Sequence, residues 1–505
     1  MTIRVLRLRS SLAVISVLAG LNALAAPVST ASEVPDGNRI VAPSSVTPIT
    51  NQTIVNQVTS GQQYDAATVA LTGGGYVVTW DDNTRQGVYA RRFNADATPA
   101  GSEFIVNTTT TGTQFFPSIG ALTNGGFVIA WQSGSLSAAD IRARRFDVAG
   151  NAAGNDFLVN TTTANEQLNT KVIGLTGGGF VVAWDTIAGG AYQDVSAQLY
   201  NAAGAAVGGQ FLLNTTTADQ QGISTLSPLA GGGFVAVWQS INPAGSNNAD
   251  VFFQRFLSDG SKVGPESQVN VLTADSQYGN DVATTTDGGF IISWTDPGTD
   301  RIIARRFDAS GNALSGEIVV ATPTAPSIGG TTVSAIAAGG AVVSWTEGDG
   351  NANIVRARAF DASNAMITDV FTVSQNTADF PVQTADGVTT LTNGNVLFAW
   401  DGPTTAADQD IYDRLYSIQG SSALATISGR VTTSGGTALR AMVINLVDGN
   451  SNTRRAVTGT FGFYRFENVP TGSYTISVST RHYQFSPQNL QVTGDLSNVN
   501  FVASP

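Results

Sequence analysis

The chain has 505 residues, a formal net charge of −12 and no cysteine. Charged residues make up only 12% of it, about half the usual share, whereas glycine is abundant with 55 copies. The acidic balance argues against nucleic acid and anionic membranes as partners, and the lack of cysteine excludes disulfides and thiolate metal sites.

The N-terminus has the composition of an export signal. Three arginines within the first nine residues precede an apolar run from Leu12 to Leu24, and Ala23-Leu-Ala25 offers a small-x-small cleavage site. About 13 apolar residues are too few to span a membrane, which takes roughly 20. We therefore expect residues 1–26 to be a signal peptide and residues 27–50 a flexible leader. An uncleaved anchor is the alternative. The mature protein is expected in the bacterial envelope or the medium, without a membrane span.

A glycine-rich segment that ends in tryptophan repeats along the chain. Its first copy is GGGYVVTW at 73–80, and the following copies end 51 to 56 residues apart. The seven tryptophans of the chain close one copy each: Trp80, Trp131, Trp184, Trp238, Trp294, Trp345 and Trp400. Such regular spacing identifies a structural repeat.

Each unit predicts four strands. In the first unit these are an apolar run (67–71), the strand that ends in Trp80 after a glycine-rich turn, VYARRF (88–93) and EFIVNT (103–108). Four antiparallel strands per roughly 50 residues, repeated seven times, are the signature of a β-propeller. A linear array of small sandwiches is the alternative, but roughly 50 residues are too few for one sandwich.

The two ends of the array complement each other. The seventh unit supplies three strands (386–391, 395–400 and 411–416) and lacks a fourth, whereas residues 53–65 resemble a fourth strand with its exit loop. We therefore predict an all-β fold in which an N-terminal strand closes a seven-bladed propeller over residues 51–418. Such closure leaves no open sheet edge.

The repeats resemble blades of large secreted bacterial proteins, including adhesin-like and calcium-binding, haemolysin-like ones. In these repeats glycines open the second strand and tryptophan closes it, as in GGGFVVAW (177–184). The resemblance covers residues 51–418 and implies the propeller without a single activity. The chain lacks the glycine-aspartate nonapeptide runs of calcium β-rolls, so that function is not carried over.

After a linker at 419–423 the pattern changes. Segments such as AMVINLVDG (441–449) alternate apolar and polar residues, as strands of a small sandwich do. The hairpin GFYRF (462–466) followed by VPTGSY (469–474) resembles the carboxypeptidase regulatory-like domain, a transthyretin-like, Ig-like β-sandwich. The resemblance covers residues 424–505 and implies a non-catalytic accessory module, often a spacer or a surface module.

Catalytic motifs are scarce. The single histidine, His482, lies in the C-terminal module, so neither a Ser/His/Asp triad nor a multi-histidine metal site can be assembled. We expect His482 to be a solvated strand residue and assign no catalytic residue.

Carboxylates recur in the loops between the second and third strands. These loops share a face of the propeller with the Asn- and Thr-rich connections between blades, so this face should suit Ca²⁺ or sugar hydroxyls. The candidate binding residues are Asp81, Asp82, Asp185, Asp194, Asp250, Asp296, Asp300, Asp349, Asp401 and Asp410. A solvated acidic rim is the alternative, because no loop has the full ligand spacing of a calcium site.

A second row stands two residues before the end of each third strand. Its members are Arg91, Arg144, Gln198, Gln254, Arg305, Arg358 and Arg414. A ring of cations could grip an anionic ligand, but a residue repeated in every blade is expected to satisfy carbonyls or carboxylates between blades. The same reasoning places the tryptophans in the core. Function is expected where blades differ, as in the long loops 185–194, 239–250 and 401–410.

The leading hypothesis is a monomeric, non-catalytic binding or adhesion protein whose propeller face recognises a glycan or a cell-surface protein. One alternative is a propeller hydrolase or lyase that acts on polysaccharide through carboxylates of the central face. Another is a structural component of a surface layer. No cofactor is predicted apart from Ca²⁺ at the acidic loops.

Overall fold

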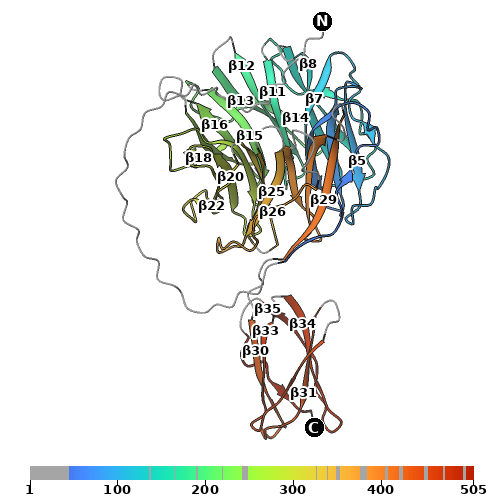
Figure 1. Ribbon diagram of the computed structural model, residues 1–505, viewed down its shortest axis with the longest axis vertical. Coiled ribbons are helices and arrows are strands. Elements are labelled where there is room, and N and C mark those ends of the chain that lie inside the picture. The colour runs from blue at the N-terminus through green and yellow to red at the C-terminus, as the bar shows by residue number, and fades with distance from the viewer. Residues whose placement is uncertain are drawn as a thin grey trace. The chain divides into compact units, whose positions relative to one another are not determined.

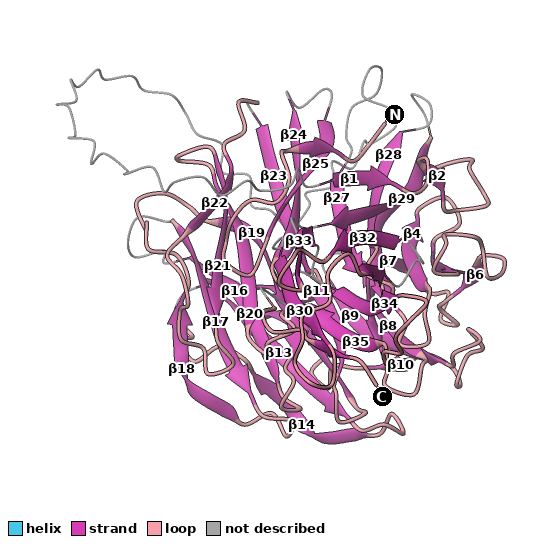
Figure 2. Cartoon of the chain, turned by 90° about the horizontal axis from the view of Figure 1, so that it is seen from below, coloured by secondary structure: helices cyan, strands magenta, loops and turns pink. Residues whose placement is uncertain are grey.

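The computed structural model describes residues 45–135, 138–164, 166–188, 192–218, 220–241, 248–325, 327–337, 339–348, 353–375, 384–403, 408–419, 425–448, 453–469, 472–492 and 496–504. These residues form strands and loops without a helix, and hence without a helix that could cross a membrane (Figure 1, Figure 2). The chain forms two compact units, Val46–Ile418 and Gln419–Pro505. The predicted signal peptide lies outside the described residues, as do residues 27–44 of the leader.

Seven antiparallel sheets make up the first unit, and the prediction of a seven-bladed propeller is confirmed. Blade one contains β3 (Gln63–Ala70), β4 (Tyr76–Asp82), β5 (Gly87–Phe93) and β6 (Phe104–Ile105). Blade two contains β7 (Thr113–Ala121), β8 (Phe127–Ser135), β9 (Ala138–Phe146) and β10 (Phe157–Leu158). Blade three contains β11 (Glu166–Gly174), β12 (Phe180–Ala188), β13 (Tyr192–Tyr200) and β14 (Ala206–Leu212). Blade four contains β15 (Gln220–Pro228), β16 (Phe234–Ile241), β17 (Ala249–Phe256) and β18 (Lys262–Gln268).

The remaining blades follow the same order. Blade five contains β19 (Tyr278–Thr284), β20 (Phe290–Asp296), β21 (Arg301–Phe307) and β22 (Ile318–Ala321). Blade six contains β23 (Ser327–Ala335), β24 (Ala341–Gly348), β25 (Asn353–Phe360) and β26 (Phe371–Thr372). Blade seven contains β27 (Thr384–Thr390), β28 (Val396–Pro403) and β29 (Gln409–Gln419). The first strand of each blade contacts the first strand of the next, and β27 contacts β3, so the ring closes.

The N-terminal segment completes blade seven, as predicted. In β2 (Thr53–Ile54), Thr53 pairs with Asp413 and Ile54 with Tyr412 of β29. A further strand, β1 (Ser45–Pro48), also pairs with β29. The sheet thus includes residues that the sequence analysis places in the leader, because the end of β29 offers unpaired backbone groups: the carbonyl of Leu415 accepts the N–H of Ile49 at 2.8 Å.

Several first strands begin earlier than predicted. β3 starts at Gln63 rather than at Ala67, and a β-bulge separates its two halves between Tyr64 and Ala67. At the bulge Asp65 adopts a φ of 55°, a left-handed conformation that is uncommon outside glycine. The bulge interrupts the alternation of side chains and hides the first half of the strand from sequence patterning.

The tryptophans lie between the blades, as expected. All seven are at most 1% exposed, and each belongs to a hydrophobic cluster shared by two adjacent blades. Burying about 200 Å² of indole contributes at most about 5 kcal/mol at each junction. Inside blades two and three the indole N–H donates to a glutamine side chain of the first strand, Gln114 or Gln167, and in blade five to Gln277 directly before the first strand.

Arginine side chains of the predicted row cross five of the seven blade junctions, which confirms their expected packing role. In each case Nη1 donates to a backbone carbonyl at the end of the preceding blade's fourth strand. The pairs, called the arginine links, are Arg91 to Val55, Arg144 to Val106, Arg305 to Val269, Arg358 to Val320 and Arg414 to Val373, at 2.6–3.0 Å. The two glutamines of the row differ, since Gln198 and Gln254 donate to carbonyls of their own blades.

A second set of side chains crosses six junctions. Here a carboxylate or amide in the fourth strand, or directly before it, accepts a backbone N–H from the loop that follows the preceding blade's fourth strand. These acceptor links are made by Gln52, Glu103, Asp156, Gln210, Glu266 and Glu317. Blade six has Val370 at this position, so of these two kinds of link its junction with blade five has only the arginine link. Every junction therefore has at least one of the two links.

The second unit is a two-layered β-sandwich. One sheet has the order β33 (Phe463–Val469), β30 (Ala425–Thr432) and β36 (Phe501–Val502). The other has the order β32 (Thr453–Val457), β31 (Val443–Asp448), β34 (Gly472–Ser479) and β35 (Gln488–Val492). Alternate residues of β30 are buried in a core that draws on both sheets, as the apolar–polar alternation predicts.

The distribution of the two kinds of link predicts that the blade junctions differ in how much an arginine link contributes to stability. Arg358→Gln should lower the free energy of unfolding by about 1.5–3 kcal/mol, because it removes a charged hydrogen bond where no acceptor link exists. The matched variant Arg144→Gln should cost less, because Asp156 still accepts the N–H groups of Thr108 and Thr109 at its junction. Denaturant unfolding followed by tryptophan fluorescence compares the two, and an equal or larger loss for Arg144→Gln would contradict the account.

Candidate functional site

Three of the predicted binding aspartates pair with asparagines that lie two residues beyond the end of a fourth strand. In blade three, Asn214 Oδ1 accepts the N–H of Val195 at 2.8 Å, and its Nδ2 donates to Asp194 at 2.6 Å. The other pairs are Asp250 with Asn270 and Asp410 with Asn56, each at 2.6 Å. Asp140 and Asn160 make the same contact at 2.7 Å. These carboxylates orient the amides that tie the third strands to the fourth.

Two further candidates cap the turns that follow their own strands. Asp82 Oδ1 accepts the N–H groups of Thr84 and Arg85 at 2.9 and 2.8 Å, and its Oδ2 pairs with the Arg85 guanidinium at 2.5 Å. Asp296 accepts the N–H of Gly298 at 3.1 Å and the hydroxyl of Thr299 at 2.7 Å. Aspartate at the start of a tight turn commonly satisfies backbone donors in this way.

The aspartates directly after tryptophan face the following blade. Asp185 is fully buried, and its Oδ1 accepts the N–H of Ile223 in blade four at 2.6 Å. Asp81 makes a longer contact, 3.4 Å, to the N–H of Phe116 in blade two. Both donors lie at first-strand irregularities, where the ladder leaves a backbone N–H unpaired. Asp401 is fully buried as well and accepts the side-chain amide of Gln409 at 3.0 Å.

The aspartates of the predicted acidic face thus have different structural roles. Asp300 is exposed at the end of a turn, with a φ of 52°. Asp349 lies outside the described residues, as do parts of the three long loops. Among the described residues, no group of three His, Cys, Asp or Glu side chains is arranged to hold a metal ion.

A polar cluster on the inner strands was missed by the sequence analysis. Lys171 of β11, Thr225 of β15 and Asp281 of β19 share one register position, each opposite the residue that precedes tryptophan. The Thr225 hydroxyl hydrogen-bonds Asp281, whose Oδ2 accepts the N–H of Val333 in blade six at 2.7 Å. The only available signal is composition, because Lys171 is one of two lysines in the chain.

Two buried carboxyl groups close to Lys171 have raised pKa values. Burial raises the pKa of Asp185 to about 7, although the N–H of Ile223, the amide of Asn169 and the charge of Lys171 act to lower it. Burial also raises the pKa of Asp281, again against the charge of Lys171. Lys171 therefore acts on carboxylates of blades three and five at the inner wall of the ring. Because both carboxylates already accept backbone N–H groups of the next blade, the cluster ties blades together.

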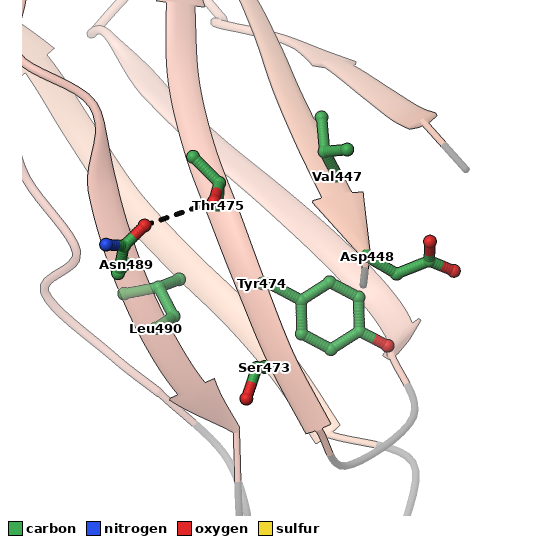
Figure 3. Close-up of a pocket in the computed structure, with 7 residues that line it drawn as sticks. All are labelled: Val447, Asp448, Ser473, Tyr474, Thr475, Asn489 and Leu490. Atoms are coloured by element: carbon green, nitrogen blue, oxygen red, sulfur yellow. Dashed lines mark hydrogen bonds between the residues drawn. The ribbon is translucent and has the colours of Figure 1, made fainter. Parts of the chain in front are cut away.

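The described part of the C-terminal module contains an open cavity of about 440 Å³. It lies on the four-stranded sheet and is lined by Val447, Asp448, Ser473, Tyr474, Thr475, Asn489 and Leu490 (Figure 3). The Tyr474 ring lies beside Asp448, and the Thr475 hydroxyl donates to Asn489 Oδ1 at 3.1 Å. His482 is exposed in the loop after β34 rather than within a strand.

One known domain family matches the C-terminal module. Residues 426–504 match the carboxypeptidase regulatory-like domain. The expected relationship of this carboxypeptidase regulatory-like module is thereby confirmed. The match covers the module alone, and the resemblance of the propeller to adhesin-like repeats stays a prediction. No curated protein matches the chain.

Several solved structures resemble the chain at low identity. One is a protein of unknown function from Dyadobacter fermentans, with 11% identity over 74% of this chain and 99% of that chain, and a TM-score of 0.45. A second is an ulvan lyase of a polysaccharide lyase family, with 11% identity over 74% and 96% and a TM-score of 0.47. A third is a mutant NanB sialidase from Streptococcus pneumoniae, with 6% identity over 68% and 83% and a TM-score of 0.44. The propeller assignment rests on the strand pairing of this chain.

The raised pKa of Asp185 predicts a distinctive pH dependence. Because the folded state holds this proton up to about pH 7 and the unfolded state releases it near the usual pKa of 3.8, the contribution to stability is full below pH 3.8 and is lost progressively as the pH rises to about 7. From pH 4.5 to 7 the free energy of unfolding should fall relative to that of Asp185→Asn, by up to about 1.4 kcal/mol per pH unit.

The control is Asp308→Asn. Asp308 lies in an exposed turn, where hydrogen bonds from Asn312 lower its pKa, so this variant should follow the wild type above pH 4.5. A wild-type stability that runs parallel to that of Asp185→Asn from pH 4.5 to 8 would contradict the assignment.

Proposed function

We propose that the protein is a non-catalytic binding protein of the bacterial envelope or medium, which recognises a glycan or a cell-surface protein. One observation carries the proposal: most of the described candidate carboxylates already accept hydrogen bonds inside the fold. Asp82, Asp185 and Asp410 are fully buried, and each has named donors at 2.5–3.1 Å. The propeller then acts as a rigid body, with binding surfaces elsewhere on the chain.

The cost of rearranging these carboxylates supports this view. Removing a partner from a buried charged hydrogen bond costs roughly 1.5–3 kcal/mol, and more where a charge is left unpaired. An enzyme that used Asp82 or Asp185 in catalysis would have to break such contacts at each turnover. Recognition by exposed side chains has no such requirement.

A polysaccharide hydrolase or lyase remains the second candidate, because the raised pKa of Asp185 is a property that suits a general acid near neutral pH. However, a general acid must come within hydrogen-bond reach of its substrate, whereas Asp185 is fully buried with both oxygens engaged by Ile223 and Asn169. The binding proposal needs no such opening of the blade junction.

Retention experiments test the proposal directly. The purified mature chain should be retained on a glycan array or by bacterial cells in a pull-down. Asp185→Asn should retain the same ligands where it stays folded, because this side chain lies inside the propeller. Absence of retention on both surfaces would contradict the proposal. Polysaccharide turnover by the wild type that disappears in Asp185→Asn would favour the enzyme instead.

A further inference from the structure

The outer face of the three-stranded sheet in the C-terminal module carries large exposed apolar side chains. Phe463 of β33 is 60% exposed and Val502 of β36 58%, and Phe461, in the turn directly before β33, is 71% exposed. On the same strand as Phe463, the inward residues Tyr464 and Phe466 are buried in the core. The sandwich thus has its apolar core on the other side of β33, and packing does not account for aromatic rings on the outer side.

An arginine is held among these rings. Arg430 of β30 lies opposite Phe463 of β33, with its guanidinium carbon 5.2 Å from the centre of that ring. Its Nε donates to the carbonyl of Phe461 at 2.9 Å. Across the described residues, Nη1 and Nη2 have no hydrogen-bond partner. The cation–π contact and the Nε bond fix the guanidinium and leave two terminal nitrogens for a ligand.

The module is cationic although the whole chain is acidic. Residues 419–505 contain six arginines and three acidic residues, a formal charge of +3, whereas residues 46–418 contain 15 basic and 32 acidic residues, a formal charge of −17. A second arginine, Arg465, follows Phe463 on the outer face and forms an exposed ion pair with Glu467 at 3.1 Å. An anionic ligand is therefore attracted to the C-terminal module and repelled by the propeller.

We propose that Arg430, Phe461, Phe463 and Val502, called here the aromatic face, bind an anionic polysaccharide. The phenyl rings stack on apolar sugar faces, and the terminal nitrogens of Arg430 pair with a uronate carboxylate or a sulfate group. This inference rests on the proposed binding function. It assigns the ligand class and moves recognition from the propeller to the module.

The size of the face favours a polysaccharide over a protein partner. Stable protein interfaces take about 20–30 residues from each side, whereas the aromatic face offers four side chains around one fixed cation. The cavity on the other sheet suits an anion less well, because Asp448 lines it. An acidic protein, including the propeller of a second copy, is the competing occupant that the experiment must distinguish.

The experiment uses the full mature chain in affinity electrophoresis and calorimetry. The probes are polygalacturonate as the carboxylated glycan, dextran sulfate as the sulfated one and dextran as the neutral one. The wild type should bind at least one anionic probe more tightly than dextran, and more weakly as salt rises. Phe463→Ala and Arg430→Gln should each weaken this binding about tenfold or more, because each removes a central contact of the face.

Matched controls lie on the other sheet. Arg455→Gln removes one exposed arginine from β32, and Asn489→Ala alters the cavity, so both should bind the anionic probe like the wild type. All four substituted residues lie at the surface, and an unchanged melting temperature confirms folding. Equal loss for Arg455→Gln and Arg430→Gln would mean general charge attraction and would overturn the proposal.

Other outcomes distinguish failure of the aromatic face from failure of the proposed binding function. Retention by cells or glycans that Phe463→Ala and Arg430→Gln leave unchanged would overturn the aromatic face and leave the proposed function standing. Concentration-dependent dimerisation that the same variants abolish, without binding of either anionic probe, would assign the face to a protein partner and overturn the proposal. No retention on any surface would contradict both.

Discussion

The propeller depends on side chains that cross each blade junction and bond to backbone groups that the sheets leave unpaired. Apolar burial around the tryptophans supplies most of the attraction between blades, but it is non-directional. Hydrogen bonds fix the register. Arginine links cross five junctions and acceptor links six, and the junction of blades five and six has an arginine link, from Arg358, but no acceptor link. The N-terminal strand brings Gln52 and Val55 into both sets, so closure extends the same bonding around the whole ring.

These links change the meaning of the charged residues in the propeller. An acidic side chain that recurs in every repeat looks like a binding face, yet Asp194, Asp250 and Asp410 each orient an asparagine. The large negative charge of residues 46–418 thus includes many carboxylates that serve the fold. The module shows the reverse pattern, with few charges and with Arg430 held beside an exposed ring. The proposed recognition surface is therefore one that the fold does not need.

The sequence predicts the architecture well because its strongest signals are local and repeated. The tryptophan spacing defines seven units, and the spare strand at 53–65 predicts the closure seen in β2. The bulges stay hidden, because the left-handed position is filled by Asp65, Phe116 or Asn169 rather than by glycine in blades one to three. A local pattern cannot show which backbone N–H a bulge releases.

The site is predicted less well for a related reason. Asp194 and Asn214 are separated by 20 residues, and the same separation recurs for Asp140 with Asn160 and for Asp250 with Asn270. This spacing is visible in the sequence, but only the pairing of third and fourth strands shows that it joins two side chains. Lys171 and Asp281 belong to blades three and five, and only the closed ring makes their charges interact.

The central claim is that the carboxylates of the acidic face serve the fold. Carbodiimide labelling of carboxyl groups in the folded chain, read by mass spectrometry, tests it most directly. The account predicts that Asp82, Asp185 and Asp410 are labelled far more slowly than in the unfolded chain, whereas the exposed Asp300 is labelled readily. Rapid labelling of Asp82, Asp185 and Asp410 at the rate of Asp300 would contradict it.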